Sequence, residues 1–312
     1  MYESLAALDH VRLNFSAENS IVINVSLALM MFGVALDVKL EHFQQLLQNP
    51  RQLIAGVLSQ AIVMPALTFV LVMLLGSHIT VGVALGMILV AACPGGNISN
   101  FITSLARGNV ALAVSLTAVS TMLAVVMTPF NFTFWGNWYA QNSHLVRPLS
   151  IDWQELFKSV MFILGIPLFL GMLCSFYYPS LAQRLLKPFR IFSLLFFIAL
   201  IVIVFSRNLD IFINHIQYVF IVVLIQNALA LLTGYGMGKV FGLSEQNCQT
   251  LTIETGIHNS GLGLALLFNP AIFPPDLPLG GMTVIAGWWS IWHIVSGVAI
   301  AYYWRWRSYK NS

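Results

Sequence analysis

Long apolar segments separated by short polar stretches dominate the hydrophobic pattern of this chain. A helix that crosses a bilayer needs about 20 mostly apolar residues. The pattern predicts nine membrane-spanning helices, at residues 20–38, 52–75, 80–106, 109–130, 155–177, 190–207, 216–241, 247–268 and 280–304. No polar stretch is long enough for a soluble domain. We therefore expect residues 1–312 to form a single polytopic, all-α membrane domain.

The composition agrees with this prediction. Of the 312 residues, 58% are hydrophobic and only 8% are charged, whereas a soluble domain has about 25% charged residues. The net charge of +3 is small and scattered, so nucleic acid is not an expected partner. Cys93, Cys174 and Cys248 have neither metal-ligand nor disulfide spacing and are read as small apolar residues. Residues 1–19 lack the basic region and short apolar core of a secretory signal.

The distribution of Lys and Arg predicts the orientation, because cytoplasmic loops are enriched in both. With the N-terminus outside, only Arg12, Arg147, Lys158 and Arg207 of the 14 Lys and Arg residues lie on the outer side. Nine spans then leave the C-terminus in the cytoplasm. The expected location is the plasma (inner) membrane, with the lipid bilayer as partner and no obligate protein partner.

The longest connection, roughly 131–154, is rich in aromatic residues. Two interpretations stay open. It forms either a lid over a substrate or a belt of aromatic side chains at the outer leaflet, where Trp and Tyr are enriched.

Two of the predicted helices are interrupted by polar residues and glycines. The first contains Cys93-Pro-Gly-Gly-Asn-Ile-Ser-Asn100, and the second contains Leu251-Thr-Ile-Glu-Thr-Gly-Ile-His-Asn-Ser-Gly261. Glu254, in the second run, is an acid at bilayer depth, where a charge is costly and usually marks an ion or substrate pathway. Gln60 precedes the first run and Gln226-Asn227 precedes the second, so the layout is repeated. The first interrupted helix is predicted to run inwards and the second outwards, so the two repeats have opposite topology. Paired interrupted helices in inverted repeats are typical of transporter sites.

The ends of interrupted helices predict the chemistry of the site. Unpaired N–H groups at the starts of the second half-helices, near Asn97 and Asn259, attract an anion. Carbonyl groups at the ends of the first half-helices, with Glu254 and neighbouring hydroxyl and amide oxygens, attract a hard cation. The sequence therefore predicts cation-coupled symport of an organic anion, with no cofactor beyond the coupling ion.

Both interrupted runs, together with Ala106-Arg-Gly-Asn-Val-Ala-Leu112, resemble the signatures of the bile acid:sodium symporter family. The resemblance extends from about Asn24 to the end of the chain. It implies two discontinuous helices that cross, a core domain at about 80–130 and 216–304, and a panel domain drawn from about 20–75 and part of 155–241. Bacterial members of the family have ten spans. In lacking the first, this chain looks like the nine-span animal members.

The resemblance also implies two sodium sites. The first corresponds to Ser99, Asn100, Thr117 and Glu254, and the second to Gln60, Glu254, His258 and backbone carbonyls near Thr255 and Ile257. Ala113 occupies the place of a family serine in the first site, and His258 that of a family glutamine in the second. Because imidazole is a poor ligand for an alkali cation, we expect one sodium ion per cycle, or none, with His258 standing in for the second.

The sequence says less about the substrate and the residues that bind it. Asn97, in the place of a family threonine, Asn259, Ser260 and His293 are the candidate substrate contacts. Bile acids, pantoate-like acids and keto acids all stay open as substrates.

Four alternatives remain from the sequence. Glu254 and His258 could couple transport to protons, or form a purely structural pair. An intramembrane hydrolase would use Glu254, His258 and His293, but no nucleophile motif or HExxH-type spacing supports an enzyme. A receptor would lack an attached signalling domain.

Overall fold

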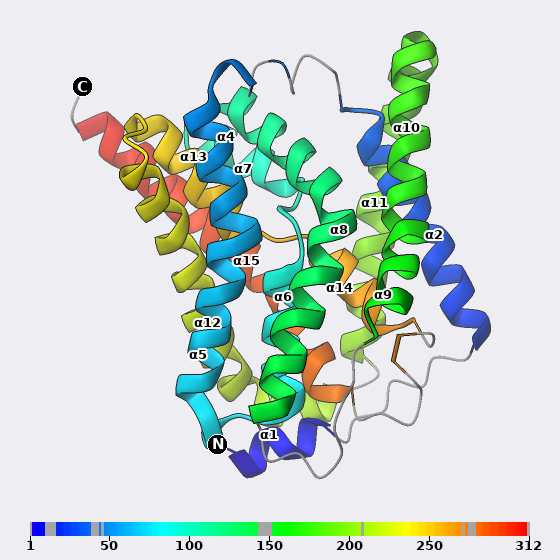
Figure 1. Cartoon of the computed structure of the whole chain (residues 1–312), viewed down its shortest axis with the longest axis vertical. Helices are drawn as coiled ribbons and strands as arrows, with labels where there is room; N and C mark the ends of the chain where they lie inside the picture. The colour runs from blue at the N-terminus through cyan, green and yellow to red at the C-terminus, as the bar shows by residue number, and fades with distance from the viewer. Residues whose placement is uncertain are drawn as a thin grey trace.

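The computed structural model describes residues 2–9, 17–38, 44, 47–142, 152–206, 209–269, 272–273 and 279–310, and its regular elements are helices (Figure 1). Arg12, Lys39, Arg147 and Arg207, which entered the prediction of orientation, lie outside these residues. The first half of the described chain contains α1 (Tyr2–Asp9), α2 (Ala17–Ala35), α4 (Pro50–Leu58), η1 (Ser59–Val63), α5 (Met64–Leu75), η2 (Gly76–His78), α6 (Val81–Ala92), α7 (Ile98–Leu105) and α8 (Val110–Asn142). The second half contains α9 (Trp153–Val160), η3 (Met161–Gly165), α10 (Ile166–Tyr177), α11 (Pro179–Ser206), α12 (Leu209–Val240), α13 (Glu245–Gly256), α14 (Ser260–Leu267) and α15 (Gly280–Lys310).

The prediction of an all-helical, apolar architecture is confirmed for the described residues. In that part of the chain, 5 helical stretches are long and apolar enough to cross a membrane: Pro50–His78, Val110–Asn142, Trp153–Tyr177, Ile216–Val240 and Gly280–Arg307. Asn24–Ala35 and Val81–Ala92 are shorter apolar helices. The short helix α1 was not predicted, because eight residues that include Glu3 and Asp9 give no spanning signal.

The predicted connection at 131–154 is wrong over its first half. Helix α8 continues through Pro129 to Asn142, so most of the aromatic residues lie on a helix and not in a loop. Trp135 and Trp138 stack on each other with ring centroids 5.6 Å apart, and Trp138 also stacks on Phe69 of α5 at 4.9 Å. Residues 143–151 lie outside the described part.

A proline explains the local distortion of the helical stretch Pro50–His78. Pro65 has no N–H to bond the carbonyl of Ala61, four residues earlier, and its ring would clash with that carbonyl in a regular helix. The backbone widens there into the π-helical turn η1, as helices often do at such positions. Asn131 of α8 donates its Nδ2–H to the freed Ala61 carbonyl at 2.8 Å. This hydrogen bond joins η1 to α8.

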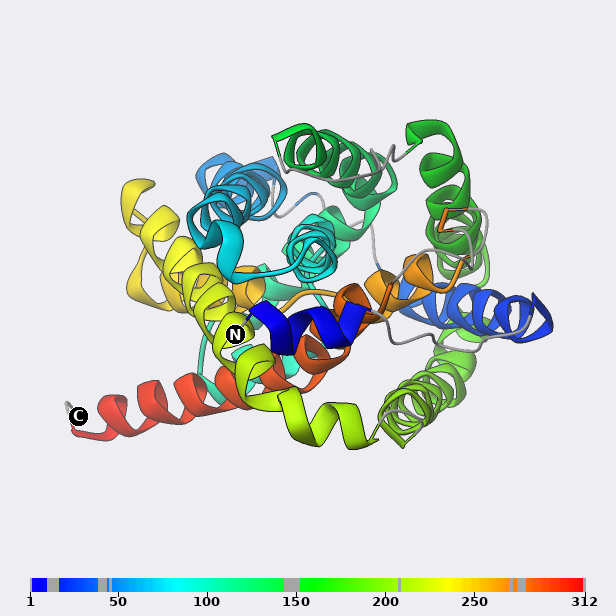
Figure 2. The same ribbon diagram turned by 90° about the horizontal axis from the view of Figure 1, so that it is seen from below.

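The helices pack in two groups. Helices α2, α10 and α11 pack against one another, and a second group contains α5, α6, α8, α12 and α15. Figures 1 and 2 show the first group side by side along one edge of the molecule. Arg190 of α11 pairs with Asp37, just after α2, at 3.0 Å. Helix α1 lies across the ends of α12 and α15 (Figure 2).

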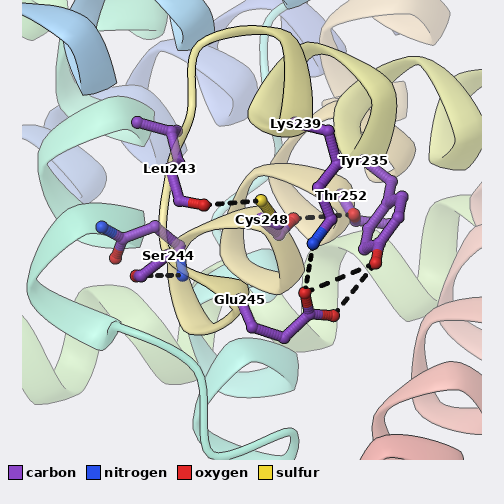
Figure 3. A network of polar contacts seen from close by, with 8 residues as sticks. Tyr235, Lys239, Leu243, Ser244, Glu245, Cys248 and Thr252 are labelled. Atoms are coloured by element: carbon purple, nitrogen blue, oxygen red, sulfur yellow. Dashed lines mark hydrogen bonds and ion pairs between the residues drawn. The ribbon is translucent and has the colours of Figure 1, made fainter.

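Helix α13, which carries Glu254, is held tightly against α12. Gly234 and Gly238 of α12 face α13, and a Cβ at Gly238 would lie only 2.9 Å from the Cys248 sulfur. Small residues allow such close approach of membrane helices. At the turn of this hairpin, Glu245 accepts hydrogen bonds from Lys239 at 2.6 Å and from Tyr235 at 3.1 Å (Figure 3). The bond from Lys239 lowers the pKa of the Glu245 carboxyl below its ordinary value.

Candidate functional site

The two interrupted segments meet at their interruptions. Helix α6 ends at Ala92 and α7 begins at Ile98, while α13 ends at Gly256 and α14 begins at Ser260. Between the half-helices the chains are extended and joined by two backbone hydrogen bonds. Gly96 donates to the Ile257 carbonyl at 2.8 Å, and Asn259 donates to the Pro94 carbonyl at 2.7 Å. The starts of α7 and α14 are therefore neighbours, although they are about 160 positions apart in the chain.

Two glycines make this close approach possible. A Cβ at Gly96 would lie 3.0 Å from the His258 carbonyl oxygen. A Cβ at Gly95 would lie 3.3 Å from Glu254 Oε2 and 3.4 Å from Gln60 Nε2. A side chain at either position would press on backbone or on a candidate ligand, which would have to move by a few tenths of an ångström. Glycine at both positions therefore favours the observed close approach.

Glu254 lies at the centre of a cluster of oxygen atoms. Its side chain is 0% exposed. Ser99 of α7 donates its hydroxyl hydrogen to Glu254 Oε1, and Thr117 of α8 lies 2.9 Å from Glu254 Oε2. Thr117 Oγ1 also lies 3.3 Å from Asn100 Oδ1 and 3.0 Å from the Ala113 carbonyl oxygen. The structure thus brings together all four residues predicted for the first cation site. Ala113 adds no side-chain ligand, but its carbonyl oxygen borders the cluster.

Among the residues predicted for the second cation site, Thr255 and Ile257 have hydrogen-bond partners and the His258 ring has none. The Thr255 hydroxyl is hydrogen-bonded to Ser59 at 2.7 Å, and the Ile257 carbonyl accepts the bond from Gly96. Both ring nitrogens of His258 lack a hydrogen-bond partner among the described residues, and its ring stacks on Trp289 at 5.4 Å. The structural pairing of Glu254 with His258 is therefore wrong, since no hydrogen bond joins them.

The candidate substrate contacts occupy different environments. Asn97 is exposed at the start of α7 and makes no capping bond, whereas Asn259 caps α14 by accepting from Leu262 N–H at 3.1 Å. The Asn259 amide also reaches the Met31 sulfur of α2 at 4.0 Å, where the two helix groups meet. Ser260 and His293 are buried. The ring of His293 lies edge-on to Trp289.

Sequence reasoning missed the residues that satisfy the carbonyl ends of the first half-helices. Thr128 of α8 donates to the carbonyl of Ala92, the last residue of α6, at 2.8 Å. Asn227 of α12 donates to the carbonyl of Gly256, the last residue of α13, at 2.8 Å. Such carbonyls have no intrahelical donor. The sequence did contain a signal for Asn227, because an amide side chain at mid-membrane depth needs a hydrogen-bond partner. The sequence analysis used Asn227 only as part of the repeated layout.

Apolar helices, two interruptions in contact and a buried carboxylate surrounded by oxygens define a multi-pass membrane transporter. Residues 24–215 match the profile of the Sodium Bile acid symporter family. The chain belongs to this family, which confirms the resemblance inferred from its motifs. Family membership and relatives that are named transporters or cotransporters identify the protein as a transporter and not an enzyme.

The similarity extends over most of the chain. It is 30% identical to the uncharacterized sodium-dependent transporter YocS of Bacillus subtilis (strain 168), over 90% of this chain and 82% of that protein. It is 28% identical to the probable chloroplastic sodium/metabolite cotransporter BASS2 of Oryza sativa subsp. japonica, over 85% of this chain but only 63% of that protein. It is 27% identical to the ileal sodium/bile acid cotransporter of Cricetulus griseus, over 85% of this chain and 75% of that protein.

Proposed function

We propose that the protein is a sodium-coupled symporter of an organic anion that works by alternating access. The proposal rests on family membership and on the surroundings of Glu254. Relatives described as sodium-dependent or as sodium/metabolite and sodium/bile acid cotransporters support the coupling ion and the general class of substrate.

The observation that carries the proposal is a buried carboxylate without a cationic partner. No ion pair to Glu254 is found among the described residues, and the groups that contact its oxygens are hydroxyls of Ser99 and Thr117. An uncompensated charge in a low-dielectric interior is costly. A sodium ion bound by the carboxylate, the two hydroxyl oxygens and Asn100 would supply the missing charge, and oxygen ligands suit hard cations.

We assign the coupling ion to this first site. In the second candidate site, the Ile257 carbonyl already accepts a backbone hydrogen bond from Gly96, and His258 replaces an amide oxygen by ring nitrogens. One sodium ion per cycle follows from this difference. Glu254 and His258 are not hydrogen-bonded to each other, so the structure gives no support to proton coupling through this pair.

The anion is proposed to bind where α7 and α14 begin. Both helices start beside the same pair of backbone hydrogen bonds, so their positive ends are close to each other and to the cation site. Asn97 and Asn259 would donate amide hydrogens to the anion, with Ser260 and His293 behind them. A bound cation next to the anion would strengthen binding of both, which is the physical basis of coupling.

Alternating access is proposed to use the two helix groups. Helices α2 and α9–α11 would act as the panel and the rest as the core, with the contact between Met31 and Asn259 at their boundary. Helix α5 packs with α6, α8 and α12, so we place it in the core and not in the panel. The N-terminus is proposed to face outward and the C-terminus the cytoplasm, in the plasma (inner) membrane.

The test compares two acids on the same helix. Glu254→Gln removes the buried charge, and Glu245→Gln removes an exposed carboxylate from the start of α13. In proteoliposomes with an imposed sodium gradient, Glu254→Gln is expected to lose sodium-driven accumulation while Glu245→Gln retains at least half. Wild-type accumulation by Glu254→Gln would refute the site.

The substrate is to be found by ligand-induced thermal stabilisation. Bile acids, pantoate-like acids and keto acids are compared with and without sodium. A true substrate is expected to stabilise the wild type more in sodium than in potassium, because cation and anion bind cooperatively. Glu254→Gln should lose this difference.

A further inference from the structure

The exposed face of α15 changes character along the second half of the helix. Val295 and Ala299, nearest the middle of α15, are exposed and apolar. Tyr302 and Trp306 continue this face and are 57% and 56% exposed. Lys310, in the last turn, is exposed as well. These five positions recur every three or four residues, so they lie on one side of the helix. We call them the α15 stripe.

The end of the α15 stripe is positively charged. Arg307, three residues before Lys310 on the same helix, is also exposed. Lys239 forms an ion pair with Glu245 at 2.6 Å (Figure 3). The pKa of the Glu245 carboxyl is lowered by the hydrogen bond from Lys239 first, and the charge of Arg307 also contributes. One carboxylate paired with Lys239 cannot also neutralise Arg307 and Lys310, so this end of α15 keeps a net positive charge.

Trp306 and Lys310 place a cation above an exposed aromatic ring. The Lys310 Nζ lies 4.2 Å from the centroid of the Trp306 ring, and this cation–π contact holds the ammonium in position. An ammonium has three N–H donors, so a phosphate oxygen can bind to Lys310 while the contact is kept. Trp and Tyr side chains prefer the depth of the lipid head groups in a bilayer. The rings of Trp306 and Tyr302 therefore place the Lys310 charge at the level of phospholipid phosphates.

The shape and charge of this end of α15 select the kind of partner. Figure 2 shows the last turns of α15 projecting from the neighbouring helices. A second copy of the chain, packed symmetrically on the α15 stripe, would bring the Arg307 and Lys310 charges of both copies together, which is unfavourable. A phospholipid matches every part of the stripe, because its acyl chains are apolar, its glycerol region lies at the depth of the aromatic rings and its phosphate is an anion.

We propose that the α15 stripe binds one anionic phospholipid, with its phosphate on Arg307 and Lys310 and its acyl chains against Val295 and Ala299. A zwitterionic phospholipid has the same phosphate but carries its own cation, which Arg307 and Lys310 repel. Each basic residue at the membrane surface strengthens binding of anionic lipid by a factor of about five. The site requires only that the protein lies in a membrane, and it does not rest on the transport function proposed above.

The experiment compares two phospholipids with identical acyl chains, dioleoyl phosphatidylglycerol and dioleoyl phosphatidylcholine. The purified full chain in detergent is titrated with each, and native mass spectrometry measures the lipid-bound fraction. Arg307→Gln combined with Lys310→Gln removes both cations, and Trp306→Leu keeps the cations but removes the ring. Arg184→Gln combined with Lys187→Gln is the matched control, because these two exposed residues have the same three-residue spacing on another helix, α11.

The wild type is expected to bind phosphatidylglycerol at least about tenfold more tightly than phosphatidylcholine, since two basic residues contribute. Loss of the Arg307 and Lys310 charges should reduce this preference to below about threefold, whereas the control pair should keep at least about fivefold.

Equal losses in the two double variants would show that surface charge attracts lipid without a site, and would overturn the proposal. Displacement of bound phosphatidylglycerol by glycerol 3-phosphate would identify the occupant as a free phosphate and would also overturn it. Trp306→Leu decides the matter should the Arg307 and Lys310 double variant fail to fold. It should lower the preference at least about twofold, and an unchanged preference would refute the site.

Discussion

Asn227 offers a direct measure of how strongly the end of an interrupted helix depends on a cap. Its amide donates to the Gly256 carbonyl at 2.8 Å, and its side-chain oxygen accepts from Ser296 at 2.5 Å. The N–H that a continuous helix would offer to Gly256 belongs to Ser260, which donates to His258 instead. The substitution Asn227→Leu preserves volume but removes the cap.

The expected loss of stability can be worked out from these contacts. Ser296 has a second acceptor in the His293 carbonyl, so the Gly256 carbonyl is the one group left unsatisfied. An orphaned buried carbonyl costs about 1–3 kcal/mol. An unfolding entropy of about 2.1 cal/mol/K per residue gives a shift of about 1.5 °C per kcal/mol for a chain of 312 residues. Asn227→Leu should therefore lower Tm by about 3 °C for a loss of about 2 kcal/mol.

Thr233→Val is the control on the same helix. The Thr233 hydroxyl bonds only the Leu229 carbonyl within α12, and its loss should cost below about 0.6 kcal/mol, the average for hydrogen bonds in membrane helices. Thermal unfolding of both purified variants, followed by tryptophan fluorescence, gives the comparison. If the Tm of Asn227→Leu lies within about 1 °C of that of Thr233→Val, about half of the expected difference, the cap does not stabilise the interruption.

Three further predictions concern ion binding, substrate binding and membrane topology. His258→Gln restores an amide oxygen at the second cation site and should lower the half-saturating sodium concentration at least threefold; an unchanged value would remove His258 from ion binding. Alanine at Asn97 or Asn259 should raise the substrate KM about tenfold, the equivalent of one hydrogen bond to a charged group, while sodium half-saturation stays within twofold; the reverse pattern would move both residues to the cation site. Cysteines introduced at Ser4 and Ser312 should be labelled from opposite sides of the membrane; labelling from one side would refute an odd number of spans.

The sequence alone determined the class of the protein. Apolar segments near the length of a bilayer-crossing helix leave little choice but helices, because every backbone polar group must be satisfied inside a membrane. Glu254 was conspicuous for the same reason, as a charge that the bilayer would reject without a function. Its partners Ser99, Asn100 and Thr117 followed from family resemblance, and the structure brings them together around its carboxylate.

Where helices end was harder to read. The aromatic run after Pro129 looked like a connection, since it loses the apolar pattern, yet α8 continues to Asn142. Stacking of Trp138 on Phe69 of another helix stabilises it there. Local sequence carries no information about such a partner.

Only the tertiary structure decided how polar groups are matched across helices. Asn131 bonds the carbonyl that Pro65 leaves free, and Asn227 bonds the carbonyl at the end of α13. His258 turned out to stack on Trp289 rather than to bond Glu254. A sequence shows which groups need partners in a membrane interior, because it shows the polar residues and the helix breakers. Which partner each group finds depends on the packing of helices distant in the chain, and only the folded arrangement contains that information.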